Sequence, residues 1–247
     1  MLINCPTLLI RDVGNNLRET MYKQKTDREL IELLAIHKKL TFQSQLNLKT
    51  ELNQRNLNEN IEDLENTINE KVSDIENLDY LKNLGFKADK FGESIKVTRT
   101  DKAMLMDIIA IVLGIIFCII GFFGILGLIG SFSSDSEFSI FSLIVEIGMI
   151  AIGFLGVKFL SGIKRLIDYS GFELLNNNGT IILKKRFDTK LVEIQKNESL
   201  LELKEQSELM ILKLENDNIL SANTNNIIQK MTISELTKKL KTVANNV

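Results

Sequence analysis

Glu146 is the residue whose type and position could do the most chemistry in this sequence. It is the single charged residue in an apolar stretch that covers residues 138–157. A charged group near the middle of a bilayer costs about 2.5–3.5 kcal/mol to insert, so such residues usually face protein or water. We expect the partners of its carboxyl group to be Ser142, one turn earlier, and the first apolar segment near Cys118 and Gly121.

Three interpretations of Glu146 stay open. The carboxyl group could fix the packing of two helices or of an oligomer by hydrogen bonding. It could line a polar pore or a proton path. It could also be a tolerated residue without a role. Because ionisable residues inside membranes are usually functional, we favour the first interpretation over the other two.

No other residues form a pattern typical of catalysis. The chain has no glycine-rich phosphate loop, no nucleophile elbow and no zinc-ligand spacing. Its one histidine, His37, lies in a helical pattern that predicts a position on a helix surface. Two cysteines, Cys5 and Cys118, are too few for a disulfide framework, and the net charge of −2 lacks the basic footprint of nucleic-acid binders. We therefore expect a non-enzymatic protein with no cofactor, no metal and no nucleic-acid partner.

Two apolar segments predict a transmembrane hairpin over residues 103–163, with spans at about 104–130 and 138–157. No charged residue occurs from Ile108 to Ile129. That stretch is about 22 residues, or about 33 Å of helix, and so exceeds a hydrocarbon core of about 30 Å. A helical hairpin buried in a soluble protein is the alternative, but a chain this short leaves too little protein to cover it.

The charges that flank the two spans predict their orientation. Thr100 and Asp101 are suitable N-caps for the first helix, and Asp107 would lie in its first turn, where a negative charge suits the helix dipole. The link between the spans, SFSSDSEFS, holds no Lys or Arg, whereas both outer flanks are basic. The positive-inside rule therefore predicts a multi-pass protein of the inner (plasma) membrane with both termini in the cytoplasm.

Small residues recur along both spans at helical spacing. In the first span they are Gly114, Cys118, Gly121 and Gly124, and in the second Gly153 shares a face with Ser142 and Glu146. Small residues allow transmembrane backbones to approach closely. We expect these stripes to pack the two helices against each other, and packing between copies of the protein is the alternative.

Residues 1–85 predict an N-terminal helical arm. Thr26 and Glu29 form a capping box, and Gly85 is a candidate C-terminal cap. The arm could be one helix of about 85 Å or two helices folded back near residues 41–44. A heptad seam, in which Lys71 takes a d-like position, consists of Leu57, Ile61, Leu64, Ile68, Ile75 and Leu78. This seam indicates either an oligomerising coiled coil or an amphipathic helix that packs on the chain's own domain, with equal weight.

Strand patterns flank the hairpin on both sides, in residues 86–102 and 164–247. ESIKVT alternates before it, and GFELLNNNGTIILKKRF, KLVEIQ and ELMILKLENDN follow it, with Asn-Asn-Asn-Gly as a hairpin turn. Residues 190–214 fit strands better than the alternative, a helix that pairs with the arm. Thr232 and Glu235 form a second capping box, which predicts the start of a C-terminal helix. The expected fold class is an α+β membrane protein whose small antiparallel β domain is split around the hairpin.

Residues 91–247 resemble bacterial two-transmembrane proteins that carry a pleckstrin-homology-like β domain in the cytoplasm. The resemblance rests on GFELLNNNGTIILKKRF, ELMILKLENDN and the closing TISELTKKLKTV. It implies about seven antiparallel strands and a closing helix, of which five or six strands can be identified in the sequence.

We therefore expect a membrane-anchored scaffold that displays the β domain and the helical arm to a cytoplasmic protein partner. We also expect contact with membrane lipid and assembly into a homo-oligomer. The alternative is an oligomeric pore in which Glu146 faces a polar path, since the layout also resembles, coarsely, the two-transmembrane effectors of bacterial antiviral systems.

Overall fold

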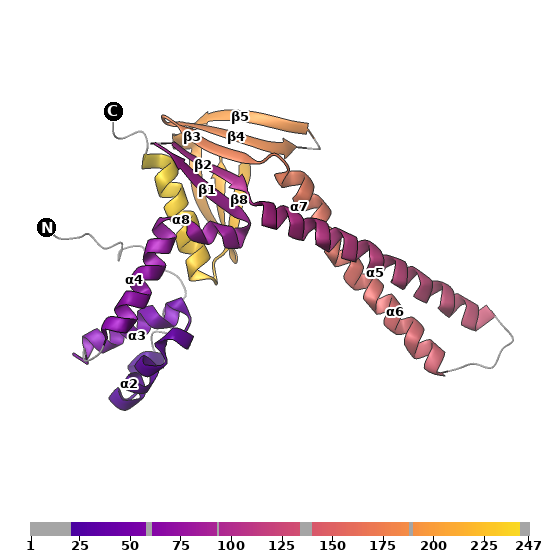
Figure 1. The fold of residues 1–247 in the computed structure, drawn as a ribbon, viewed down its shortest axis with the longest axis horizontal. Coiled ribbons are helices and arrows are strands. Elements are labelled where there is room, and N and C mark those ends of the chain that lie inside the picture. Colours follow the sequence, from indigo (N-terminus) through magenta and orange to yellow (C-terminus); the bar gives the residue numbers. More distant parts are fainter. Residues whose placement is uncertain (1–20, 58–60, 93, 134–139, 188–189, 243–247) are drawn as a thin grey trace.

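The computed structural model of the protein describes residues 21–57, 61–92, 94–133, 140–187 and 190–242. The fold is α+β: two long apolar helices project from a unit of antiparallel sheets and shorter helices (Figure 1).

The elements follow one another in an order that places the long helices between the second and third strands. The helices are α2 (Asp27–Ala35), α3 (Phe42–Gln54), α4 (Glu62–Glu76), α5 (Asp101–Ser133), α6 (Ile140–Phe159), α7 (Ser161–Tyr169) and α8 (Ile227–Thr242), with the 3-10 helices η1 (His37–Lys39), η2 (Asp79–Leu84) and η3 (Glu198–Leu200). The strands are β1 (Phe86–Phe91), β2 (Ser94–Arg99), β3 (Glu173–Asn177), β4 (Thr180–Phe187), β5 (Lys190–Asn197), β6 (Leu201–Gln206), β7 (Leu209–Leu214) and β8 (Asp217–Asn223).

Helices α5 and α6 are long and apolar enough to cross a membrane. With 33 and 20 residues they extend over about 50 Å and about 30 Å. The backbone N–H of Ala103 donates to Thr100 Oγ1 at 3.2 Å, so the predicted cap at the start of α5 is confirmed. After α6 the chain bends at Leu160 and continues as α7, which packs against the first part of α5.

Strands from both sides of the long helices form one sheet. Its order is β1-β2-β3-β4-β5, all antiparallel, and β2 pairs directly with β3 although α5, α6 and α7 separate them in sequence. The predicted turn in Asn-Asn-Asn-Gly joins β3 to β4, with positive φ angles of 48° at Asn178 and 81° at Gly179. These angles suit Asn and Gly, which explains why the turn could be recognised from the sequence.

Residues 190–214 are extended, as expected, and not part of a helix that pairs with the arm. They comprise β5, the short η3, β6 and β7. Strands β6, β7 and β8 make a second, three-stranded antiparallel sheet. The described residues contain eight strands, which is two or three more than the five or six that the sequence pattern indicates, and β1 is among the strands missed.

Both sheets and α8 share one hydrophobic core. Fully buried members include Leu183 from the first sheet, Leu212 from the second and Leu236 from α8. The predicted start of α8 is wrong, because the helix begins five residues before Thr232. Thr232 lies inside the helix and donates its hydroxyl to the Ile228 carbonyl at 2.7 Å, so it caps nothing.

The N-terminal arm is a compact helical unit and not one long helix. The helical conformation is interrupted between α2 and α3 and again between α3 and α4. The observed arm is therefore closer to the folded-back alternative than to one long helix, and Thr41 is the N-cap of α3. The predicted capping box of Thr26 and Glu29 is confirmed, and so is Gly85 as the C-cap of η2. Side chains of α8 complete the core of this unit, which therefore lies against the β domain (Figure 1).

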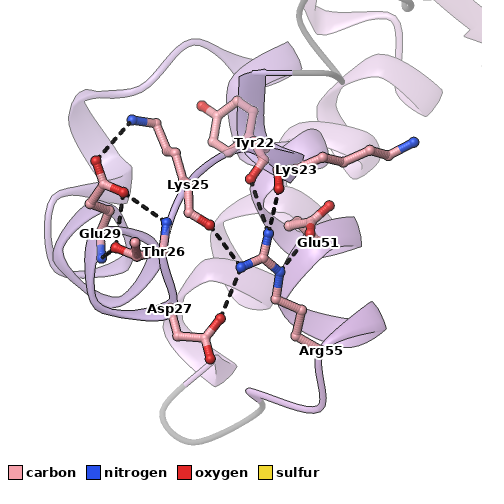
Figure 2. Close-up of polar contacts among 8 residues, drawn as sticks. All are labelled: Tyr22, Lys23, Lys25, Thr26, Asp27, Glu29, Glu51 and Arg55. Carbon is pink, nitrogen blue, oxygen red and sulfur yellow. Dashed lines mark hydrogen bonds and ion pairs between the residues drawn. The ribbon is translucent and has the colours of Figure 1, made fainter.

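A polar cluster around Arg55 ties the start of the described chain to the end of α3 (Figure 2). Its guanidinium group donates to the carbonyls of Lys25 and Lys23, at 2.7 and 2.9 Å, and to the carboxylates of Asp27 and Glu51, at 2.9 and 2.7 Å. The hydrogen bond to Asp27, followed by that to Glu51, raises the pKa of Arg55. One fixed side chain thus joins residues 23–27 to the end of α3.

Candidate functional site

The surface of the α5–α6 pair is apolar on nearly every side. Bulky side chains point away from the pair along both helices and are 37–76% exposed. Examples are Leu105, Val112, Ile116, Phe123, Ile144 and Phe154. Helices of this kind are usually covered, in a protein core or in lipid. Within the described chain nothing covers them, so the environment must supply the contact.

The small residues of the two helices meet each other. A Cβ atom on Gly121 would lie 2.5 Å from Gly153 Cα, and one on Gly124 would lie 2.9 Å from the Glu146 carbonyl oxygen. A Cβ on Gly114 would lie 3.0 Å from the carbonyl oxygen of Gly156. Such distances leave no room for a side chain, so the backbones of α5 and α6 touch along this line.

Cys118 lies on the same line, together with small residues that the sequence analysis did not single out. A Cβ on Gly156 would lie 2.8 Å from Cys118 N, and a Cβ on Gly162 would lie 3.1 Å from the Asp107 carbonyl oxygen. The line of close contact therefore runs from the base of the hairpin at α7 to Gly124. Gly156 lies three residues after Gly153, and Gly162 lies beyond the end of the second predicted span. The sequence pattern did not single out either residue.

Glu146 faces α5 and is 8% exposed. Its Oε1 accepts hydrogen bonds from Ser142 at 3.0 Å and from Ser131 at 2.8 Å, whereas Oε2 is buried and has no partner among the described residues. The expectation that it lies beside Cys118 and Gly121 is wrong. The residues of α5 next to its side chain are Ser131, which donates to it, and Gly127, whose Cβ would lie 3.1 Å from Glu146 Cγ. The carboxyl group therefore sits near the linked ends of the helices and not halfway along them.

A second buried carboxyl group lies at the opposite end of the pair. Asp107 is 4% exposed, and its Oδ2 accepts from Arg99 Nη2 at 2.8 Å. Arg165 of α7 approaches the other oxygen, with Nε at 3.4 Å from Oδ1. These residues come from β2, α5 and α7, so one carboxylate joins the sheet to both helices.

Aromatic rings enclose Arg99 on its other sides. Its guanidinium carbon lies 5.1 Å from the centre of the Phe86 ring and 5.0 Å from that of Tyr169, within the range of cation–π attraction. Gly85 adjoins it so closely that a Cβ there would lie 2.7 Å from Arg99 Nη1. In the cluster of Arg99, Asp107 and Arg165, here called the charged junction, Arg99 and Asp107 are thus packed closely, whereas Arg165 lies at the surface.

The expectation that Asp107 lies in the first turn of its helix, where the helix dipole would stabilise its charge, is therefore wrong. Since α5 begins at Asp101, Asp107 lies in the second turn, where the helix dipole has faded, and it is held by two arginines. One sequence signal could have indicated this ion pair. Asp107 is an acid at the start of the first apolar span, and arginines lie just before that span (Arg99) and just after the second span (Arg165).

The heptad residues of the arm pack in the hydrophobic cores of the same chain. Ile61, Leu64, Ile68 and Ile75 are buried in the helical unit with α2 and α3, Leu57 packs at its edge, and Leu78 belongs to the core of the β domain. Lys71, the polar residue of the seam, donates to Gln45 Oε1 at 2.8 Å, and burial lowers its pKa. No continuous apolar seam is exposed along the described part of α4.

The expected surface position of His37 is also wrong. Its side chain is 7% exposed, Nδ1 lies 2.8 Å from the Leu34 carbonyl oxygen, and Nε2 lies 3.3 Å from Thr67 Oγ1 and 3.5 Å from Asp63 Oδ2. The chain turns at η1, which directs this residue between α2 and α4. It acts there as a polar link inside the helical unit.

Among the described residues, no group of three or more His, Cys, Asp or Glu side chains lies close enough to hold a metal ion. Comparisons of the chain with protein families, with curated proteins and with solved structures give no match.

Proposed function

We propose that the protein is a non-enzymatic membrane scaffold. The α5–α6 hairpin crosses the inner membrane and holds the β domain and the helical unit at the cytoplasmic surface. The observation behind this proposal is the apolar surface of the hairpin, which nothing else in the described chain covers. A core helix of a soluble protein would be mostly buried, and a signal sequence would lie at the N-terminus.

The spacing of the two buried carboxyl groups supports the same proposal. Asp107 lies 20 residues before Gly127, the residue of α5 that contacts Glu146. Twenty residues of helix extend over about 30 Å, the thickness of the hydrocarbon core of a bilayer. Both groups would then lie at the edges of the hydrocarbon, where a polar residue costs far less than at its centre.

The charged junction supports rigid display of the β domain. Arg99 ends β2 and contacts Asp107 of α5, and Asp107 also binds Arg165 of α7, so the sheet is held to α5 and, through Asp107, to α7. The helical unit is in turn packed on the β domain through α8. We propose that a protein partner meets this unit as one body, and that the meander of strands closed by α8 is a pleckstrin-homology-like arrangement.

Single-cysteine labelling tests the anchor and its orientation. In a variant without Cys5 and Cys118, Ser136→Cys in the link should react with an impermeant maleimide in intact cells. Thr180→Cys in the β domain should react only after the membrane is opened. The reverse pattern would overturn the orientation, and release of the protein from membranes by alkaline carbonate would overturn the anchor.

We favour the scaffold over the pore alternative because of the place of Glu146. Glu146 is enclosed between α5 and α6 and bonded to two serine hydroxyls of the same chain, so it does not present a polar surface to a second copy.

A further inference from the structure

We propose that the end of the β4–β5 hairpin rests on the anionic surface of the membrane that holds α5 and α6. This end is defined here by residues 185–187 and 190–192. The inference rests on the proposed function, because it takes the hairpin to lie in the bilayer. It adds a second contact with lipid, made by the β domain itself.

Strand register places this end level with the base of the hairpin. Thr98, Glu173, Lys184 and Glu193 form one row across β2 to β5. Beyond this row β2 continues for one residue, and α5 begins at Asp101. Strand β4 continues for three residues beyond it, or about 10 Å. Both therefore extend from the row in the same direction, and the end of the β4–β5 hairpin lies on the side of α7 in Figure 1.

Contacts with the end of α7 hold this part of the sheet in place. Arg186 Nε donates to the Ser170 carbonyl at 3.2 Å, and Lys185 Nζ lies 5.8 Å from the centre of the Tyr169 ring. A Cβ on Gly171 would lie 3.3 Å from Leu191 Cδ1. Because α7 continues directly from α6, these contacts fix the distance of the β4–β5 end from the membrane.

Two apolar residues at this end of the edge strand β5 are uncovered; the other large apolar residue exposed in this sheet, among the residues described, is Phe91 on the opposite edge strand β1. Leu191 is 52% exposed and Val192 is 37% exposed. They point to opposite faces of the edge strand β5, so neither the second sheet nor α8 covers both. Farther along β4, Ile181 and Leu183 are fully buried. Exposed apolar residues therefore occur on this edge strand at the end nearest the membrane.

The charge of the β4–β5 end suits an anionic surface. These six residues include Lys185, Arg186 and Lys190, and the sequence places one acid, Asp188, between the two strands, so the segment 185–192 carries three basic residues against one acid. Lys185 Nζ donates to the Asn218 carbonyl at 2.8 Å, a neutral group that leaves its charge in place. Lys158 and Lys164, at the base of the hairpin, are exposed. Basic residues beside exposed apolar ones are typical of surfaces that bind anionic lipid at the interface.

Fluorescence quenching in proteoliposomes tests this contact with the full chain, in a background of Cys5→Ser and Cys118→Ala. A bimane probe is attached at Leu191→Cys, at Thr180→Cys on the opposite end of β4, or at Phe123→Cys on α5. Vesicles contain phosphatidylcholine with or without phosphatidylglycerol, and carry nitroxide on the head group or on the acyl chain. We expect head-group quenching at residue 191 to exceed that at residue 180 at least about twofold in anionic vesicles, and to fall without phosphatidylglycerol.

The probe at residue 123 separates this inference from the proposed function. Acyl-chain quenching at residue 123, together with equal quenching at residues 191 and 180, overturns the lipid contact and leaves the anchor standing. Absence of quenching at residue 123 overturns both. Quenching at residue 191 that is the same in neutral and anionic vesicles overturns the role of anionic lipid.

Discussion

Arg99 and Asp107 form a buried ion pair, with 2.8 Å between Nη2 and Oδ2, that links the last residue of β2 to the second turn of α5. The side chains are 10% and 5% exposed. Loss of one partner of such a pair leaves an uncompensated buried charge, which costs about 3–5 kcal/mol. The stability of the β domain is thus coupled to the hairpin through this pair.

Asp107→Ala should therefore destabilise the protein strongly. We expect the melting temperature, followed by circular dichroism in detergent micelles, to fall by roughly 10 °C. Arg165→Gln is the matched control, because Arg165 contacts the same carboxylate but is 58% exposed, and exposed pairs contribute about 0–1 kcal/mol. Equal effects of the two substitutions would contradict the assignment of the pair to Arg99.

Replacement of both partners gives a second test of the same junction. In Arg99→Met with Asp107→Leu no charge is left buried, so much of the stability lost in Asp107→Ala should return. If the double variant melts as low as the single one, the aromatic contacts of Arg99 with Phe86 and Tyr169 matter more than its charge.

Gly121→Ala should separate α5 from α6. The added Cβ would lie 2.5 Å from Gly153 Cα, a backbone atom that cannot move aside alone. Overpacking of this kind costs about 1–3 kcal/mol, so unfolding by SDS should occur at a lower detergent fraction. Gly148→Ala is the control, because nothing lies within 4 Å of a Cβ there, and it should leave the transition unchanged or raise it slightly.

The parts of the fold that could be predicted from the sequence depend on local patterns. The charge-free run from Ile108 to Ile129 marks a long apolar helix whatever surrounds it, and Asn178 with Gly179 favours a tight hairpin turn without tertiary contacts. The capping box at Thr26 depends only on Glu29, three residues away. Each of these signals is complete within a few neighbouring positions.

The residues of the candidate site depend on contacts between distant segments, which one sequence does not reveal. The depth of Glu146 follows from the register in which α6 packs on α5, and that register places it beside Ser131. Asp107 gains its partners only when β2 and α7 meet α5. His37 is buried because the chain turns at η1, a break that the helical pattern of its neighbours conceals.

Glu146 should act as a hydrogen-bonding residue between α5 and α6. Glu146→Gln keeps an acceptor for Ser131 and Ser142, so it should retain most of the stability. Glu146→Leu removes the acceptor and should cost about 0.6–2 kcal/mol in the same SDS titration. Ser131→Ala, which removes one donor, should fall between the two.

The same Glu146 variants also test the pore alternative. Dye release from liposomes that contain the protein should stay at the level of empty liposomes for the unchanged chain and for Glu146→Gln. Release that depends on Glu146, together with a detergent-corrected mass of five or more copies, would favour the pore over the scaffold.

Arg55 should hold the first described residues to the helical unit. Arg55→Lys keeps the positive charge but not the planar donor group that reaches the Lys23 and Lys25 carbonyls together with the Asp27 carboxylate. Hydrogen bonds to charged groups contribute about 1.5–3 kcal/mol, so Arg55→Lys should speed hydrogen exchange in residues 21–27 at least about tenfold. Arg28→Lys is the control, because its side chain is 89% exposed and contacts only Glu32 among the described residues, so exchange should not change. If both variants exchange alike, the cluster in Figure 2 does not stabilise this segment.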